Sequence, residues 1–433
     1  MSGESKISVA RAGHCPTGER MFAMSTPKEP LNLPLGFSAH VANIGIKDVT
    51  PDFVVVASEV PCRSVAMFTR SLFAGPSVVV SRRNAQANSL RTVVVVSKNA
   101  NVATGDEGLA NAEELGRGVA IAAACAESEV LVTSTGVIGR QYPMDRIRAH
   151  LGELAADAKS AVPAAFNTTN AVVIASAMMT TDTHPKTASA TVPTTRADGS
   201  PGTATLVGMA KGVGMIEPDM ATMLSFVFTD ADLPTKTLDR LFRHAVEHSF
   251  NSLSVDTDTS TSDTAALLAN GLAGTADEQA FALALQEVCI NLTRQLARDG
   301  EGATTLLVVE VQQARDEAQA KRVAKSILNS PLVKTAVHGA DPNWGRVAMA
   351  IGKCSDEADI DQANVRIRFG DSEVYPRQVG EAELTELEQY LAGDEVLISV
   401  DLGVDISVDA ASWKVYGCDL SDGYVRINAD YTT

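Results

Sequence analysis

The sequence predicts an α/β protein whose sheets are covered by helices. Short valine-rich runs, typical of buried strands, alternate along the chain with longer stretches whose apolar residues recur at helical spacing. The composition is that of a globular protein, with 45% apolar and 21% charged residues. The length of 433 residues is enough for about two to three domains.

The first part of the chain predicts an arm, then a sheet and a helix. Residues 1–35 contain glycine and proline without periodicity, so we expect a disordered arm there. Acidic residues followed by helical spacing predict a helix at 106–126. Short β-rich runs bounded by turn residues predict strands at 53–56, 64–68, 77–80, 92–96 and 129–135.

The rest of the chain continues this alternation. Residues 188–201 are polar and threonine-rich, which predicts a turn-like, mobile loop. Strands are expected at 205–209 and 223–228, on either side of a glycine-rich connector, and at 306–311. Further strands are expected toward the end of the chain. The expected helices are 143–154, 171–179, 234–250, 278–298, 316–328 and 344–353.

Charge and composition exclude several classes of partner. The 36 Lys and Arg residues are outnumbered by 53 Asp and Glu, and a net charge of −17 argues against nucleic acid and anionic membranes. No apolar stretch approaches the ~18 residues of a spanning helix, and the first residues lack the apolar core of a secretory signal. The six cysteines are widely spaced without a CxxC pair, which predicts reduced thiols. We therefore expect a cytoplasmic protein.

Two patterns suggest metal sites, and a simpler interpretation is favoured for each. The run HAVEH, His244 to His248, matches a zinc-peptidase pattern. On a helical wheel, however, the neighbouring apolar residues form one buried stripe, which favours an ordinary amphipathic surface helix. The acidic run from Asp256 to Asp263 lacks the glycine and terminal glutamate of an EF-hand, which favours a network of turns. We predict no metal site and no cofactor.

The most informative segment, Lys211 to Leu224, reads KGVGMIEPDMATML. Two glycines spaced by one residue allow strained backbone conformations, and Ala221 leads directly into Thr222. Considered alone, this segment predicts no more than a turn. Other distinctive strings follow one another along the chain: NANVATG (Asn99–Gly105), STGVIG (Ser134–Gly139), MTTDTHPK (Met179–Lys186), DTDTSTSDT (Asp256–Thr264), DGEGA (Asp299–Ala303), HGADPNWGR (His338–Arg346) and NADYTT (Asn428–Thr433).

In this order, the strings resemble the ornithine acetyltransferases, an arginine-biosynthetic family that also acetylates glutamate, over nearly all of residues 36–433. The resemblance implies a layered αββα sandwich with two central sheets flanked by helices, of the D-aminopeptidase and ornithine acetyltransferase type. It also implies self-cleavage between Ala221 and Thr222. The products would be an alpha fragment, 36–221, and a beta fragment, 222–433, that share one core, and two such heterodimers are expected to pair.

The chemistry of this cleavage follows from the residue type at position 222. The Thr222 hydroxyl can attack the Ala221 carbonyl in an N-to-O acyl shift, and hydrolysis of the resulting ester splits the chain. The new α-amine has an ordinary pKa of about 7.7–8.0. It can therefore accept the proton of the hydroxyl on the same residue and return it to the leaving amine.

The resemblance also assigns roles to other residues. Thr135 and Gly136 supply the oxyanion donors, through a hydroxyl and a backbone N–H. Lys211 can attract the substrate carboxylate, and Glu301 can pair with the ornithine ammonium. The positions that match the family's substrate-binding residues are Thr180, Lys211, Thr222, Glu301, Asn428 and Thr433.

The implied function is transfer of an acetyl group from N2-acetyl-L-ornithine to L-glutamate, by a ping-pong mechanism through acetyl-Thr222. One alternative is an aminopeptidase or amidase of the same fold that passes the acyl group to water, although such relatives favour a serine nucleophile. Another is an unprocessed binding or scaffold protein. The sequence leaves open whether acetyl-CoA is also a donor, and whether the product serves arginine supply or a specialised pathway.

Overall fold

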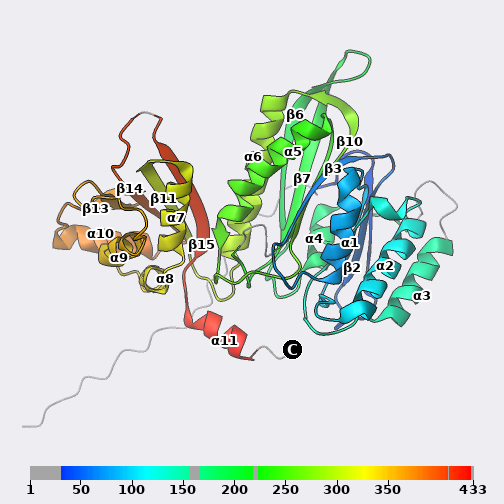
Figure 1. The fold of residues 1–433 in the computed structure, drawn as a ribbon, viewed down its shortest axis with the longest axis horizontal. Helices are drawn as coiled ribbons and strands as arrows, with labels where there is room; N and C mark the ends of the chain where they lie inside the picture. The colour runs from blue at the N-terminus through cyan, green and yellow to red at the C-terminus, as the bar shows by residue number, and fades with distance from the viewer. Residues whose placement is uncertain (1–30, 157–164, 218–222, 408, 431–433) are drawn as a thin grey trace, which may run out of the picture.

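Two sheets that pack face to face form the larger part of the molecule (Figure 1). This computed structural model describes residues 31–156, 165–217, 223–407 and 409–430. The first sheet has the strand order β1-β2-β4-β5. Its strands are β1 (Phe37–Ala42), β2 (Phe53–Ser58), β4 (Thr92–Val96) and β5 (Val130–Ser134).

The second sheet has the order β3-β10-β6-β7-β8, and β10 also pairs with β8. Alternate residues of the two sheets face each other, so that Val93 and Val95 of the first share a buried cluster with Phe226 and Phe228 of the second. The strands of the second sheet are β3 (Arg63–Phe68), β6 (Lys186–Thr195), β7 (Pro201–Lys211), β8 (Leu224–Asp232) and β10 (Thr264–Ala276).

Helices cover the outer faces of both sheets. The first sheet is covered by α1 (Pro76–Asn84), α2 (Gly105–Ala122) and α3 (Met144–Ala156), and the second by α5 (Thr235–Glu247) and α6 (Glu278–Arg298). The short α4 (Ala171–Met178) packs into the core between the sheets. The predicted αββα sandwich with two central sheets is therefore confirmed.

A third, six-stranded sheet follows, which the sequence did not indicate as a separate layer. The strand order is β13-β12-β14-β11-β15-β9. One face packs against α6, and the other is covered by α7 (Glu317–Leu328), α8 (Pro331–His338), α9 (Trp344–Gly352) and α10 (Glu381–Leu391). A last helix, α11 (Asp422–Asp430), follows β15. The strands are β9 (Leu253–Ser254), β11 (Leu306–Ala314), β12 (Arg366–Phe369), β13 (Ser372–Tyr375), β14 (Glu395–Asp401) and β15 (Ala411–Cys418).

Two predicted elements are wrong. Residues 77–80 form part of helix α1, because Gly75 caps the helix in an extended conformation and Pro76 occupies its first position. The expected loop at 188–201 instead contains most of strand β6 and the turn at Asp198-Gly199 that leads into β7, with which β6 forms a long antiparallel pair. Gly199 has a φ of +82°, the left-handed conformation that a tight hairpin connection requires.

The N-terminal arm predicted for 1–35 is described only from residue 31. Leu33 is buried and donates its N–H to the Thr169 carbonyl at 2.7 Å, so residues 31–35 are held against the sandwich. This segment differs from the disordered arm that the sequence suggested. Among the described helices, none combines the length and apolar character needed to cross a bilayer.

Candidate active site

The predicted junction lies beside the end of strand β7. Lys211, the last residue of β7, pairs in register with Leu224 of β8, and Leu224 pairs with Thr264 of β10. Met223 accepts the Thr264 N–H through its carbonyl at 3.0 Å. Ala221, Thr222 and Thr433 lie outside the described residues. The chain that follows Thr222 directly therefore enters the second sheet next to Lys211.

Lys211 connects this sheet to the first one. Its Nζ donates to the Thr135 hydroxyl oxygen at 3.0 Å, and the side chain is buried. Thr135 follows strand β5 of the first sheet, and its N–H donates to the Val96 carbonyl at 3.0 Å. The contact between Lys211 and Thr135 thus spans the two sheets at the ends of their strands.

The next residue, Gly136, has a backbone conformation that requires glycine. Its φ is +126°, and a Cβ built there would lie 2.3 Å from the carbonyl carbon of Lys98. Because the obstacle is backbone, a side chain could be accommodated only if the turn moved. The Thr135-Gly136 turn is therefore fixed closely against the neighbouring segment.

Thr180 is held beside Lys211 by a buried carboxylate. Asp182 accepts the Thr180 N–H at 3.1 Å and the Gly212 N–H at 2.7 Å. Burial alone would raise the pKa of Asp182, but Lys211 and Lys186 together lower it to about 2. Asp182 is consequently an anion under ordinary conditions. It was not singled out from the sequence, although it lies inside the string MTTDTHPK.

Glu301 and Asn428 complete the group of predicted residues. Asn428 of α11 donates its side-chain N–H to Glu301 at 2.9 Å. Glu301 donates its backbone N–H to the Val213 carbonyl at 2.8 Å, two residues beyond Lys211. Next to it, Gly302 packs so closely on the start of α11 that a Cβ would lie 2.3 Å from the Tyr424 nitrogen. These contacts place the DGEGA loop between the end of β7 and the final helix.

A buried carboxyl group for which the sequence indicated no role also faces this region. Asp263 is 5% exposed, and its Oδ2 has no hydrogen-bond partner among the described residues. Burial raises its pKa well above the usual range, against the opposing influence of the Ser260 side chain and Lys211. The signal available in the sequence was its place in the string DTDTSTSDT.

The structure therefore brings together all the described candidates: Thr135, Gly136, Thr180, Lys211, Glu301 and Asn428. Burial lowers the pKa of the Lys211 ammonium, while the nearby carboxylate of Asp182 opposes this effect. The cluster offers a buried cation, a hydroxyl and a carboxylate to a small zwitterionic ligand.

The two metal-like patterns have the simpler structures that we expected. In α5 the residues Leu238, Leu241, Phe242, Ala245 and Val246 form the buried stripe. Glu247 pairs with Lys321, and the carboxylate of Asp256 accepts the backbone N–H groups of Met215 and Ile216 at 2.6 and 2.7 Å. Within the described ranges, no group of three or more histidine, cysteine or acidic side chains is arranged to hold a metal ion.

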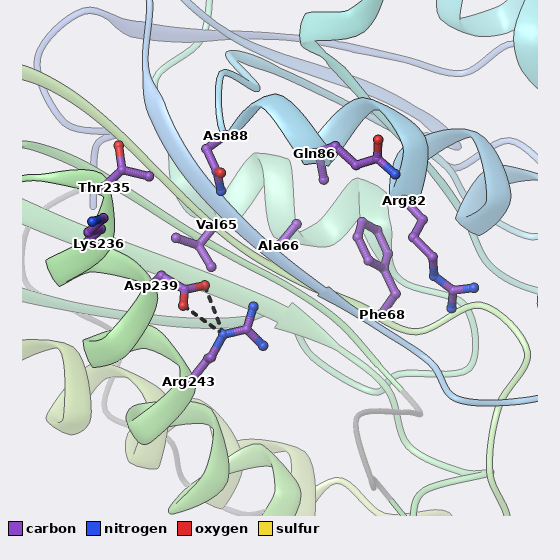
Figure 2. A pocket seen from close by; sticks show the side chains of 11 residues that line it. Val65, Ala66, Phe68, Arg82, Gln86, Asn88, Thr235, Lys236, Asp239 and Arg243 are labelled. Atoms are coloured by element: carbon purple, nitrogen blue, oxygen red, sulfur yellow. Dashed lines mark hydrogen bonds and ion pairs between the residues drawn. The ribbon is translucent and has the colours of Figure 1, made fainter.

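A cavity of about 560 Å³ lies elsewhere, between β3, α1 and α5 (Figure 2). None of the candidate site residues that the structure describes lines it. Its arginines are engaged locally, since Arg243 binds both oxygens of Asp239 at 2.9 and 3.0 Å and Arg82 donates to the Thr69 carbonyl at 2.7 Å. The cavity is therefore separate from the cluster around Lys211.

Comparison with known proteins gives the family. Residues 38–433 match the ArgJ family. Glutamate N-acetyltransferase Oat2 of Streptomyces clavuligerus is 52% identical over 415 residues, which cover 94% of this chain and 99% of that protein. The arginine biosynthesis bifunctional protein ArgJ of Rhodococcoides fascians is 50% identical over 403 residues, which cover 92% of this chain and 94% of that protein.

A solved structure, ornithine acetyltransferase of Mycobacterium tuberculosis in complex with ornithine, is 30% identical with a TM-score of 0.35. That match covers 43% of this chain and 93% of the solved one. The two relatives described above match along almost their whole length at half or more of the aligned positions. This chain therefore belongs to the ArgJ family of acyltransferases.

Proposed function

We propose that this enzyme cleaves itself between Ala221 and Thr222 and then moves an acetyl group from N2-acetyl-L-ornithine to L-glutamate. The observation that carries the proposal is the contact of Lys211 with Thr135 beside the start of β8. Family membership supports the reaction, since relatives are named glutamate N-acetyltransferase and arginine biosynthesis bifunctional protein. We propose the cytoplasm as the setting of this reaction.

The reaction proceeds in two half-reactions. The Thr222 hydroxyl oxygen attacks the acetyl carbon of acetylornithine, its proton passes to the α-amine of Thr222, and the amine returns a proton to the departing ornithine nitrogen. The acetyl group then rests on the Thr222 oxygen as an ester. Glutamate enters, and its amine attacks the ester to give N-acetylglutamate and the free hydroxyl.

The hydrogen bond between Lys211 and Thr135 orients the oxyanion donor. A lysine ammonium has only donors, so the Thr135 oxygen must accept in this contact. The hydroxyl proton of Thr135 is then free to point at a developing oxyanion, together with the N–H of Gly136. A preorganised donor of this kind typically contributes about 2.7–4 kcal/mol to transition-state stabilisation.

The charges around the site suit a substrate with one carboxylate and one side-chain ammonium. Lys211 offers the cation for the carboxylate, and Glu301 offers the anion for the ammonium. Asn428 holds one Glu301 oxygen at 2.9 Å, and the Thr181 hydroxyl lies 3.5 Å from the other. Glu301 is thus oriented before the ligand arrives.

Replacing Glu301 by glutamine is expected to raise the KM for acetylornithine, because the charge-assisted interaction with the ammonium is lost. Hydrogen bonds to charged groups contribute about 1.5–3 kcal/mol, which corresponds to a KM roughly 10- to 100-fold higher. The KM for glutamate should change much less than that for acetylornithine. The measurement is steady-state kinetics with each substrate varied in turn, and the control is Glu287→Gln, an exposed carboxylate on α6. Equal effects in both variants would contradict the role of Glu301.

The test of the overall function is a donor and acceptor screen on purified, processed protein. Acetylornithine with glutamate should give acetylglutamate and ornithine, while acetylornithine alone should give little free acetate. Rapid release of acetate without glutamate would identify a hydrolase instead. Acetyl-CoA with glutamate forms a third arm, which separates a bifunctional enzyme from one that only recycles the acetyl group.

The proposed fragments share secondary structure, which supports their staying together after cleavage. Strands β3, β6 and β7 precede position 221, and β8 and β10 follow it, yet all five belong to one sheet. We propose that the two fragments remain associated as a heterodimer and that two heterodimers pair. Size-exclusion chromatography with light scattering would show a mass near twice that of one chain if so.

A further inference from the structure

We propose that three buried side chains, Asp182, Lys186 and Asp299, form a positioning triad for the substrate site. The inference rests on the proposed function, because it concerns the residues assigned there to substrate binding. None of the three belongs to the set of residues for which the family resemblance implied a role. Each lies next to that set in sequence or in space.

Lys186 is the centre of the triad. It is the first residue of β6, and its side chain is completely buried. Its Nζ lies 2.7 Å from Asp182 Oδ1 and 2.6 Å from Asp299 Oδ2. Both carboxylates are themselves almost fully buried. Charges of this kind are removed from water at considerable cost, and apolar residues of similar size would often stabilise a fold as well or better.

Asp182 links the triad to two parts of the site. One oxygen accepts the Gly212 N–H at 2.7 Å, immediately after Lys211, and the other accepts the N–H of Thr180 at 3.1 Å. The loop that carries Thr180 and the end of β7 are therefore fixed to one carboxylate. No other described group makes both of these hydrogen bonds.

Asp299 links the triad to a third part. It follows the last residue of α6 and accepts the Thr183 N–H at 3.0 Å. Two residues later the same loop presents Glu301. Lys186 therefore connects the segment containing Thr180 with the loop containing Glu301. Asp182 connects both of these to the segment containing Lys211.

The triad also acts on Lys211 electrostatically. Within the triad, the Asp182 carboxylate favours the charged form of Lys211, and the Lys186 ammonium disfavours it. The charged groups that face Lys211 are Asp182, Lys186, Asp263 and Glu301. Burial lowers the pKa of Lys211, and Asp182 gives the largest opposing influence. Asp299 contacts Lys186 at 2.6 Å, so we expect its main effect on the site to come from holding Lys186 in place.

The two carboxylates therefore have different expected signatures. Asp182→Asn should raise the KM for acetylornithine about 10-fold or more, because charge-assisted hydrogen bonds at two site segments are weakened. It should also move the alkaline limb of the pH profile of KM to lower pH, since Lys211 loses a proton more easily without the carboxylate that most opposes the effect of burial. Asp299→Asn should raise the KM for acetylornithine by a similar factor, whereas the alkaline limb of the pH profile of KM should not shift.

The control is Asp401→Asn, which removes the partner of Arg368 at 2.8 Å in the third sheet, away from the site. It should lower the melting temperature without changing the KM or its pH profile. All variants are measured as processed protein, with folding checked by circular dichroism. If Asp182→Asn does not fold, the KM of Asp299→Asn alone tests whether the triad positions the site.

Two different failures are distinguishable. Wild-type protein that is folded and processed but transfers no acetyl group would overturn the proposed function. Active wild-type protein whose Asp182→Asn and Asp299→Asn variants keep the wild-type KM would overturn only the positioning triad. If both variants raise the KM but neither shifts the alkaline limb of its pH profile, the proposed electrostatic effect of Asp182 on Lys211 would be overturned.

Discussion

Replacing Thr222 by alanine is expected to leave one polypeptide of 433 residues and to abolish acetyl transfer. The alanine methyl group has no oxygen with which to attack the Ala221 carbonyl, so the chain cannot be cleaved and no acetyl ester can form. Loss of a catalytic nucleophile can lower kcat by about 10⁶-fold. Denaturing electrophoresis and the acetylornithine assay measure the two consequences separately.

Wild-type protein should give fragments of 221 residues and of the 212 that remain from 433. N-terminal sequencing of the smaller fragment should begin Thr-Met-Leu. Thr222→Ser keeps a hydroxyl and should still be processed, whereas Thr203→Ala, an exposed threonine on β7, should behave as wild type. Fully active wild-type protein that remains a single band would exclude the N-terminal nucleophile.

Replacing Gly136 by alanine has the second largest expected effect. The new methyl group would lie 2.3 Å from the backbone of Lys98, at a φ of +126° that other residues rarely adopt. The turn must therefore move, which displaces both the Gly136 N–H and the neighbouring Thr135 hydroxyl from the proposed oxyanion site. Loss of such a donor typically lowers kcat by about 10²- to 10³-fold.

Gly139→Ala is the matched control for this variant. Gly139 lies in the same loop with a φ of +81°, but nothing stands within 4 Å of a Cβ built there. The control therefore retains the backbone strain and lacks the collision. Comparing kcat and melting temperature of the two processed variants separates a local displacement from general destabilisation. Similar kcat values would argue against an oxyanion role for the Gly136 turn.

The prediction of secondary structure from sequence succeeded where an amphipathic stripe was long. The helix α6 was predicted at its exact bounds, because apolar residues recur at helical spacing over 21 residues. It failed at 77–80, where three consecutive valines suggested a strand. There the proline at the start of α1 and burial of Val78 and Val80 outweigh the strand preference of valine.

The threonine-rich segment shows a different failure. Residues 188–201 were interpreted by polarity. Ala188, Ala190 and Val192 nevertheless alternate with less apolar residues, and this alternation and the pair Asp198-Gly199 are signals of a hairpin. The third sheet was missed for a topological reason. Its strands are spread from Leu253 to Cys418, and the sequence does not specify which distant strands pair.

For the candidate site, local patterns gave little information. Thr135 and Lys211 are 76 positions apart, and neither stands in a pattern that indicates chemistry. The resemblance to a family supplied these residues, and the fold then placed the described ones together. The triad of Asp182, Lys186 and Asp299 needed the structure, because only the folded chain shows which of the many acidic residues share a buried ammonium.

The shared second sheet has a consequence for how the enzyme can be produced. A gene split at codon 222 would yield one piece in which β7 keeps β6 but lacks β8, and another in which β8 keeps β10 but lacks β7. Each piece would therefore have an exposed strand edge. We expect either half expressed alone to aggregate, and co-expression to restore a soluble complex. Autocleavage after folding would avoid this hazard, since the partners would already be interleaved when the peptide bond breaks.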